Sequence, residues 1–225
     1  ELDDLERDRA NFISNIIIDS LAPTNTLVGN PVAQKQVINS GGLSLIKGLQ
    51  NAYKDITENK GIVSQVDKRP FKLGENIATS KGSVVHRTEM LELVHYAPTT
   101  DEVHEIPQLT IPPQINKMYI NDLSPEKSVI KYQVDHGIQT FVISWRNPSK
   151  EQGIWGMDDY IRSCEEAIQA VSDSTGSKKV NVSAGCSGGQ TASVLASKLA
   201  AQKNDILGSL TLMVCVLHPK ERDIE

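Results

Sequence analysis

The spacing of apolar residues divides the chain into two regions of different character. Up to about residue 82, apolar positions recur with the period of amphipathic helices, and Pro23 interrupts the first of them. A second helix is expected over residues 43–56. One face of that helix carries Leu43, Ile46, Leu49 and Tyr53. We therefore predict a mostly helical region over residues 1–82.

From residue 83 onward, short apolar and β-branched runs alternate with helical patterns. The runs typical of strands are 83–87, 90–96, 108–113, 139–145, 179–183 and 209–217. The helices expected between them are 124–135, 156–171 and 188–201. Strands that alternate with helices of this length indicate a mainly parallel sheet covered on both faces. We therefore predict an α/β domain over residues 83–225.

The composition narrows the range of functions. The net charge is −5 and is spread along the chain, so no basic surface for nucleic acid is expected. No apolar run is long enough to form a transmembrane segment. The three cysteines lack the spacing of metal or redox motifs, which favours free thiols in a reducing cytoplasm.

The most informative stretch, V-N-V-S-A-G-C-S-G-G over residues 180–189, lies between a predicted strand and a predicted helix. In α/β-hydrolase folds, a sharp turn in this position presents the catalytic nucleophile. Two overlapping motifs fit the stretch, one with Cys186 and one with Ser187 at the tip of the turn. The spacing of the glycines alone favours Cys186 only slightly.

This stretch resembles the active-site sequence of polyhydroxyalkanoate synthases, whose nucleophile is a cysteine. Four other stretches are similar to that family, namely S-L-A-P-T-N (20–25), N-S-G-G-L-S-L (39–45), I-P-P-Q-I-N-K-M-Y-I-N-D-L-S-P-E-K-S (111–128) and V-I-S-W-R-N-P (142–148). The residues at 39–45 and in the cysteine stretch are most similar to those of the class II, medium-chain-length enzymes. The resemblance implies an α/β-hydrolase-type, parallel-rich sheet preceded by the helical region.

Carried over residue by residue, the resemblance assigns the nucleophile to Cys186. The backbone N–H of Ser187 would then stabilise the oxyanion, and by analogy with hydrolases a second N–H would come from Gln114 or Ile115. The family's usual glycine two residues before the nucleophile is Ala184 here. Its added methyl group raises the question of whether the turn is crowded.

The activity that the resemblance implies is polymerisation of (R)-3-hydroxyacyl-CoA into polyhydroxyalkanoate, with release of CoA, through a thioester on the cysteine. The implied partners are the acyl-CoA, CoA, the growing polyester chain, the granule surface and a second copy of the protein. The implied location is the cytoplasm, at polyester granules, and no metal or other cofactor is expected. The family's catalytic Asp and His follow the cysteine well downstream, but only 39 residues follow Cys186 here, so neither partner can be assigned. His218, the sole histidine after Cys186, comes too early in the chain for the triad histidine. We therefore expect an N-terminal fragment of a synthase that is inactive alone.

Three further residues are candidates for substrate contact. Asn116 and Tyr119 belong to the family-like stretch and are expected either to shape the entrance of the site or to pack within a loop. Trp145 ends a predicted strand at the carboxyl edge of the sheet, where ligands usually bind. Two other functions stay open from the sequence: a serine esterase or lipase that uses Ser187, and a non-catalytic fragment that binds granules.

Overall fold

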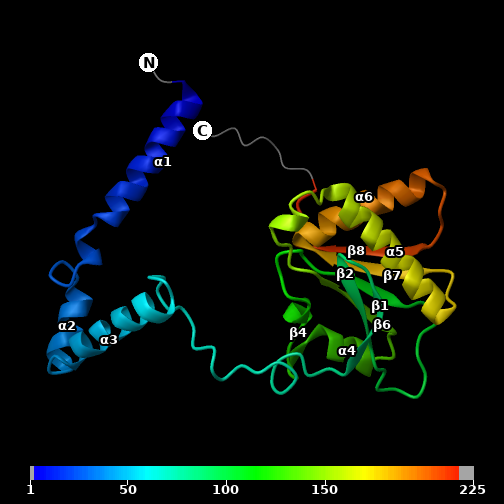
Figure 1. Cartoon of the computed structure of the whole chain (residues 1–225), viewed down its shortest axis with the longest axis horizontal. Coiled ribbons are helices and arrows are strands. Elements are labelled where there is room, and N and C mark those ends of the chain that lie inside the picture. Colours follow the sequence, from blue (N-terminus) through cyan, green and yellow to red (C-terminus); the bar gives the residue numbers. More distant parts are fainter. Residues whose placement is uncertain (1–2, 218–225) are drawn as a thin grey trace. The chain divides into compact units, whose positions relative to one another are not determined.

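The computed structural model describes residues 3–217, which divide into two compact units between Lys68 and Arg69 (Figure 1). The boundary expected at residue 82 is instead the start of the first strand, because residues 69–81 belong to the second unit. The backbone N–H of Ala78 donates to the carbonyl oxygen of Asp122 at 2.9 Å, which ties this extended segment to the second unit.

The first unit is helical, as predicted. Its elements are α1 (Asp4–Ser20), η1 (Pro23–Asn25), α2 (Pro31–Asn39) and α3 (Leu43–Glu58). The carboxylate of Asp3 caps α1 and the side chain of Asn30 caps α2, each by accepting from backbone N–H groups of the first turn. No residue of α1, α2 or α3 is buried, so many of their apolar side chains face outward.

The second unit contains a six-stranded sheet. Its strands are β1 (Gly82–Arg87), β2 (Leu91–Tyr96), β3 (Gln108–Ile111), β6 (Thr140–Trp145), β7 (Val180–Gly185) and β8 (Leu207–Met213). Their order in the sheet is β1-β2-β6-β3-β7-β8. Strand β2 is antiparallel to β1 and β6, and the remaining pairs are parallel. This order, with an antiparallel second strand, is that of an α/β-hydrolase sheet and confirms the predicted fold class.

Helices cover both faces of the sheet. The first face packs against α5 (Met157–Thr175) and α6 (Cys186–Ala201), and the second against α4 (Val129–Asp135). Successive side chains of β2 point to opposite faces of the sheet. Leu93 therefore belongs to the core under α5 and α6, and Val94 belongs to the core under α4. Cys164 lies in the first core, and burial raises the pKa of its thiol to about 12, which makes it an unreactive core residue.

The helix expected from Ser124 begins later than predicted. Ser124 ends β4 (Asp122–Ser124), which pairs with β5 (Lys127–Ser128) in a small hairpin, and α4 starts at Val129. Ser128 is the N-cap, because its hydroxyl accepts from the backbone N–H of Lys131 at 2.8 Å. Two short 3₁₀ helices, η2 (Met118–Asn121) and η3 (Lys150–Gln152), complete the described elements.

Asp122 is a fully buried carboxylate that joins the segment before β1 to this hairpin. It accepts hydrogen bonds from the backbone N–H of Ser80 at 3.0 Å, from the Ser80 hydroxyl at 2.9 Å and from the Ser128 hydroxyl. Burial, with the nearby charge of Asp122, raises the pKa of Tyr96 to about 12. These contacts make Asp122 a structural residue.

Asp122→Ala is expected to lower the free energy of unfolding of the second unit by about 3 kcal/mol, since it leaves three donors without their acceptor. Both tryptophans, Trp145 and Trp155, lie in this unit, so their fluorescence during urea unfolding reports on it. Glu126→Ala in the same hairpin is the control. Within residues 3–217 this exposed carboxylate accepts a hydrogen bond only from Ser124, so its loss should cost less than about 0.5 kcal/mol. Equal losses for the two variants would contradict the structural role of Asp122.

Candidate active site

Cys186 occupies the tip of the turn between β7 and α6. Its φ of +49° lies in the left-handed region, which is strained for a residue that carries a Cβ and is often found at functional sites. Cys186 is exposed, whereas the hydroxyl oxygen of Ser187 is buried and has no hydrogen-bond partner among residues 3–217. The turn therefore presents the thiol, and the adjacent hydroxyl is shielded.

The glycines after the cysteine let α6 approach its neighbours closely. A Cβ on Gly188 would lie 2.5 Å from the carbonyl oxygen of Ile111 and 2.7 Å from that of Pro112. A Cβ on Gly189 would lie 2.8 Å from the sulfur of Cys215. Side chains at these two positions would displace the loop after β3 or the segment after β8.

The two positions before the cysteine are less restricted. A Cβ on Gly185 would have no neighbour closer than the carbonyl oxygen of Met213, at 3.9 Å. Ala184 is fully buried in the core under α5 and α6, and it pairs with Ile111 on β3 and Leu212 on β8. Its methyl group therefore fills core space and does not crowd the turn.

Helix α6 directs free backbone N–H groups toward the turn. It has sixteen residues, and no side chain caps its N-terminus. Its first N–H groups, including that of Ser187, therefore lack intrahelical partners, and the helix dipole favours negative charge there. The arrangement can stabilise an anion that forms beside Cys186.

The loop after β3 adjoins this helix end. The close approach of Gly188 to the carbonyl oxygens of Ile111 and Pro112 brings the start of the loop against the first turn of α6. Within residues 3–217, the backbone N–H groups of Gln114 and Ile115 form no hydrogen bond. The donors expected from the sequence thus lie on two adjoining segments, and their role in catalysis stays a prediction.

Trp145 is buried, and its position favours a different role from the predicted substrate contact. Its ring N–H donates to the carbonyl oxygen of Pro112 at 2.8 Å, and its ring meets that of Tyr160 edge to face with centroids 5.3 Å apart. Because this N–H is the indole's only hydrogen-bond donor, Trp145 holds the loop after β3. Asn116 and Tyr119 are half-buried in the following segment, where their contact with substrate stays a prediction.

Thr191 belongs to the site although nothing in the sequence marks it. It is 1% exposed on α6, and its hydroxyl accepts from the side-chain amide of Gln114 at 2.9 Å. An isolated threonine within a helix is common, so only the contact with the loop identifies it.

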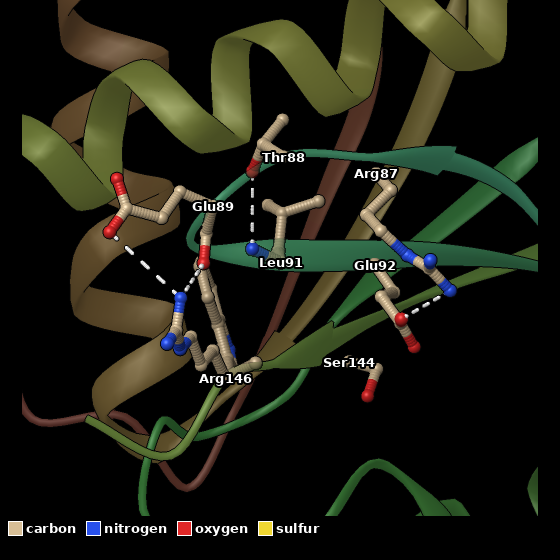
Figure 2. Close-up of a pocket in the computed structure, with 8 residues that line it drawn as sticks. Arg87, Thr88, Glu89, Leu91, Glu92, Ser144 and Arg146 are labelled. Carbon is tan, nitrogen blue, oxygen red and sulfur yellow. Dashed lines mark hydrogen bonds and ion pairs between the residues drawn. The ribbon is translucent and has the colours of Figure 1, made fainter. Parts of the chain in front are cut away.

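A cleft of about 380 Å³ lies at the edge of the sheet at which the parallel strands end, between the β1–β2 turn and the end of β6 (Figure 2). Its charged side chains pair with one another: Arg87 with Glu92 at 2.8 Å, and Arg146 with Glu89 at 3.9 Å. Because each arginine faces a glutamate, the charge of the cleft is balanced. Its lining includes neither Cys186 nor the loop residues that adjoin it.

Residues 3–217 show neither a metal-binding cluster nor a membrane-spanning helix. No group of three or more His, Cys, Asp and Glu side chains in this range is arranged to hold a metal ion. No helix in the same range has the length and apolar character needed to cross a membrane.

The family model that matches the chain and the relatives with similar sequences point to the same family. Residues 1–133 match the family model described as the N-terminus of poly-beta-hydroxybutyrate polymerase. The chain is 47% identical over 209 residues to poly(3-hydroxyalkanoate) polymerase 1 of Ectopseudomonas oleovorans, covering 93% of this chain and 37% of that protein. It is 39% identical over 218 residues to the poly(3-hydroxyalkanoate) polymerase subunit PhaC of Cupriavidus necator, covering 96% of this chain and 37% of that protein. The chain thus spans less than two fifths of the length of these relatives.

Solved structures include more distant matches. A thermostable carboxylesterase cloned from a metagenomic library aligns with a TM-score of 0.47 and 11% identity, over 67% of this chain and 51% of that one. A lipase-like protein from Sulfolobus solfataricus aligns with a TM-score of 0.45 and 15% identity, over 64% and 52% of the two chains. The fold assignment rests on the strand order and on the β7–α6 turn.

Proposed function

Because the chain belongs to the poly-beta-hydroxybutyrate polymerase N-terminus family, we propose that it is the N-terminal part of a polyhydroxyalkanoate polymerase with Cys186 as its nucleophile. We refer to the complete polymerase, of which this chain would form the N-terminal part, as the full-length protein. The observation that carries the proposal is the exposed thiol of Cys186 at a strained turn before α6, beside a buried Ser187 hydroxyl.

The proposed first step is acyl transfer from (R)-3-hydroxyacyl-CoA. The Cys186 thiolate attacks the thioester carbonyl carbon, a new S–C bond forms, and the C–S bond to CoA breaks. CoA leaves as a thiol after taking up a proton. One thioester replaces another, so the step is close to neutral in free energy.

Chain growth then forms an ester bond. The hydroxyl of an enzyme-held hydroxyacyl group attacks the carbonyl carbon of the next acyl thioester, loses its proton and displaces a thiolate. Both steps need a base, and we assign it to a His of the full-length protein outside this chain, supported by an Asp. The chain by itself is therefore expected to be inactive.

Both steps also pass through a tetrahedral oxyanion. We assign its stabilisation to the backbone N–H of Ser187 and to that of Gln114 or Ile115, which adjoin the turn. Removing one such donor typically lowers the rate by about 10²–10³-fold.

The proposal extends to the biological setting. The 47% identity with the Ectopseudomonas oleovorans polymerase supports a class II-like enzyme. We propose that the full-length protein acts in the cytoplasm at the surface of polyester granules, as a homo-oligomer. Thioester exchange needs no metal or organic cofactor.

The serine hydrolase alternative has less support. It requires the Ser187 hydroxyl to reach a carbonyl carbon, yet that oxygen is buried in the turn. The alternative of granule binding without catalysis draws on the outward-facing apolar side chains of α1 and α3, such as Phe12, Ile17 and Leu49. It predicts polyester binding with no release of CoA.

Incubating the full-length protein with (R)-3-hydroxyacyl-CoA tests the proposal against both alternatives. We expect release of CoA thiol, measured with a thiol reagent, together with insoluble polyester and no accumulation of free hydroxy acid. Release of CoA with stoichiometric free 3-hydroxy acid would instead identify a hydrolase. Binding to polyester with no CoA release would identify a granule-binding protein.

A further inference from the structure

The loop after β3 is tied to α6 by a side-chain contact as well as by backbone packing. The side-chain amide of Gln114 donates to the Thr191 hydroxyl at 2.9 Å, and that hydroxyl donates to the carbonyl oxygen of Ser187 at 3.1 Å. The chain of contacts therefore runs from the loop to the residue directly after the proposed nucleophile.

The chemistry of the threonine hydroxyl fits both contacts. A hydroxyl has one proton to donate and lone pairs to accept with. Donation to the carbonyl four residues earlier is common for Thr in helices. Here the carbonyl oxygen of Ser187 at 3.1 Å is a stronger acceptor for this proton than the sulfur of Met157 at 3.9 Å, and either choice leaves a lone pair of Thr191 for the amide of Gln114.

Within residues 3–217, the other contacts between the loop and neighbouring elements lie at its beginning, and a turn inside the loop is closed by the Asn116 N–H, which donates to the carbonyl oxygen of Pro113 at 3.1 Å. Trp145 donates to the carbonyl oxygen of Pro112, and Gly188 packs against the same carbonyl. Ile115 is 87% exposed, so packing of its side chain adds little restraint. Gln114 is thus the point at which a side chain fixes the end of the loop that carries the proposed oxyanion donors.

We propose that Gln114 and Thr191 are positioning residues, which hold the N–H groups of Gln114 and Ile115 in register with that of Ser187 around the acyl oxyanion. This inference rests on the proposed acyl transfer to Cys186. The Gln114 side chain acts through its contact with α6, whereas its backbone N–H is the candidate donor. Substituting the side chain therefore separates the two roles, because the N–H stays in place.

The test compares two reactions of the same thiol in the full-length protein. Acylation by (R)-3-hydroxyacyl-CoA forms an oxyanion, whereas alkylation by iodoacetamide displaces iodide at a saturated carbon and forms none. For Gln114→Leu and Thr191→Val, we expect the single-turnover acylation rate to fall about 10- to 100-fold with KM unchanged. The alkylation rate of Cys186 should stay within about twofold, since it depends on the thiol alone.

Two further variants sharpen the test. Thr191→Ser keeps the hydroxyl and should restore acylation. The double variant Gln114→Leu/Thr191→Val should lose no more than Thr191→Val alone, because Thr191→Val already breaks the contact that Gln114→Leu removes. Gln114 is only half-buried, so Gln114→Leu remains informative if Thr191→Val fails to fold. Unchanged acylation in Gln114→Leu, or an equal loss of acylation and alkylation, would overturn the inference. Acylation that survives Cys186→Ala would overturn the proposed function itself.

Discussion

Cys186→Ala in the full-length protein is expected to abolish transfer of the hydroxyacyl group from CoA, with a loss in rate of about 10⁴-fold or more. The reason is that the substitution removes the nucleophile, while the exposed position at the start of α6 leaves packing almost unchanged. The measurement is the initial rate of CoA release from (R)-3-hydroxyacyl-CoA, together with the thermal unfolding midpoint.

The matched control is the adjacent residue. Ser187→Ala removes a buried hydroxyl that has no hydrogen-bond partner in the described part of the chain, and it keeps the backbone N–H assigned to the oxyanion. We expect it to retain CoA release within about tenfold of the unmodified protein. The opposite pattern, with loss in Ser187→Ala and retention in Cys186→Ala, would identify the serine as the nucleophile.

Gly188→Ala is expected to produce the second largest effect. The added Cβ would lie 2.5 Å from the carbonyl oxygen of Ile111, so the loop after β3 or the start of α6 must shift. We expect a loss of about 1–3 kcal/mol in the free energy of unfolding. Since the displaced segments carry the proposed oxyanion donors, CoA release should fall by at least about 10²-fold.

Gly185→Ala in the same turn is the control for Gly188→Ala. Gly185 has a φ of −117°, which other residues adopt without strain, and its Cβ would meet nothing closer than 3.9 Å. We expect a change of less than about 1 kcal/mol in stability. If the two alanine variants lose stability and activity equally, close approach at Gly188 does not explain the glycine-rich stretch.

The identity of the residue at the turn shows what a sequence pattern leaves open. Both Cys186 and Ser187 satisfy a nucleophile motif, because the surrounding small residues allow either register. The backbone conformation distinguishes them, since only Cys186 has the left-handed φ and its side chain is exposed. Which of two adjacent residues occupies the tip of the turn depends on how the strand meets the helix. The spacing of the glycines in the sequence alone does not determine it.

The fold class is easier to predict from the sequence than the residues at which its helices begin. Alternating strand and helix patterns predict the parallel sheet, because periodicity reflects which side chains are buried. The start of α4 was predicted incorrectly at Ser124, since both Ser124 and Ser128 suit an N-cap. The hairpin contact of Ser128 with the buried Asp122 distinguishes the two, and it depends on tertiary structure.

The residues that hold the loop after β3 were also difficult to predict. Trp145 ends a strand, but its position in the sequence does not reveal that its N–H binds the carbonyl of Pro112, and its contact with substrate stays a prediction. Thr191 carried no signal at all, because its partner Gln114 lies on a distant part of the chain. Contacts of this kind depend on how β3, β6 and α6 meet.

The central claim is that the Cys186 sulfur receives the acyl group, and mapping the covalent adduct tests it most directly. The full-length protein is mixed briefly with (R)-3-hydroxyacyl-CoA, quenched in acid and digested, and its peptides are analysed by mass spectrometry. We predict a hydroxyacyl mass increase on Cys186 that hydroxylamine removes, as expected for a thioester. An adduct on Ser187, or acyl transfer with Cys186 unmodified, would contradict the account.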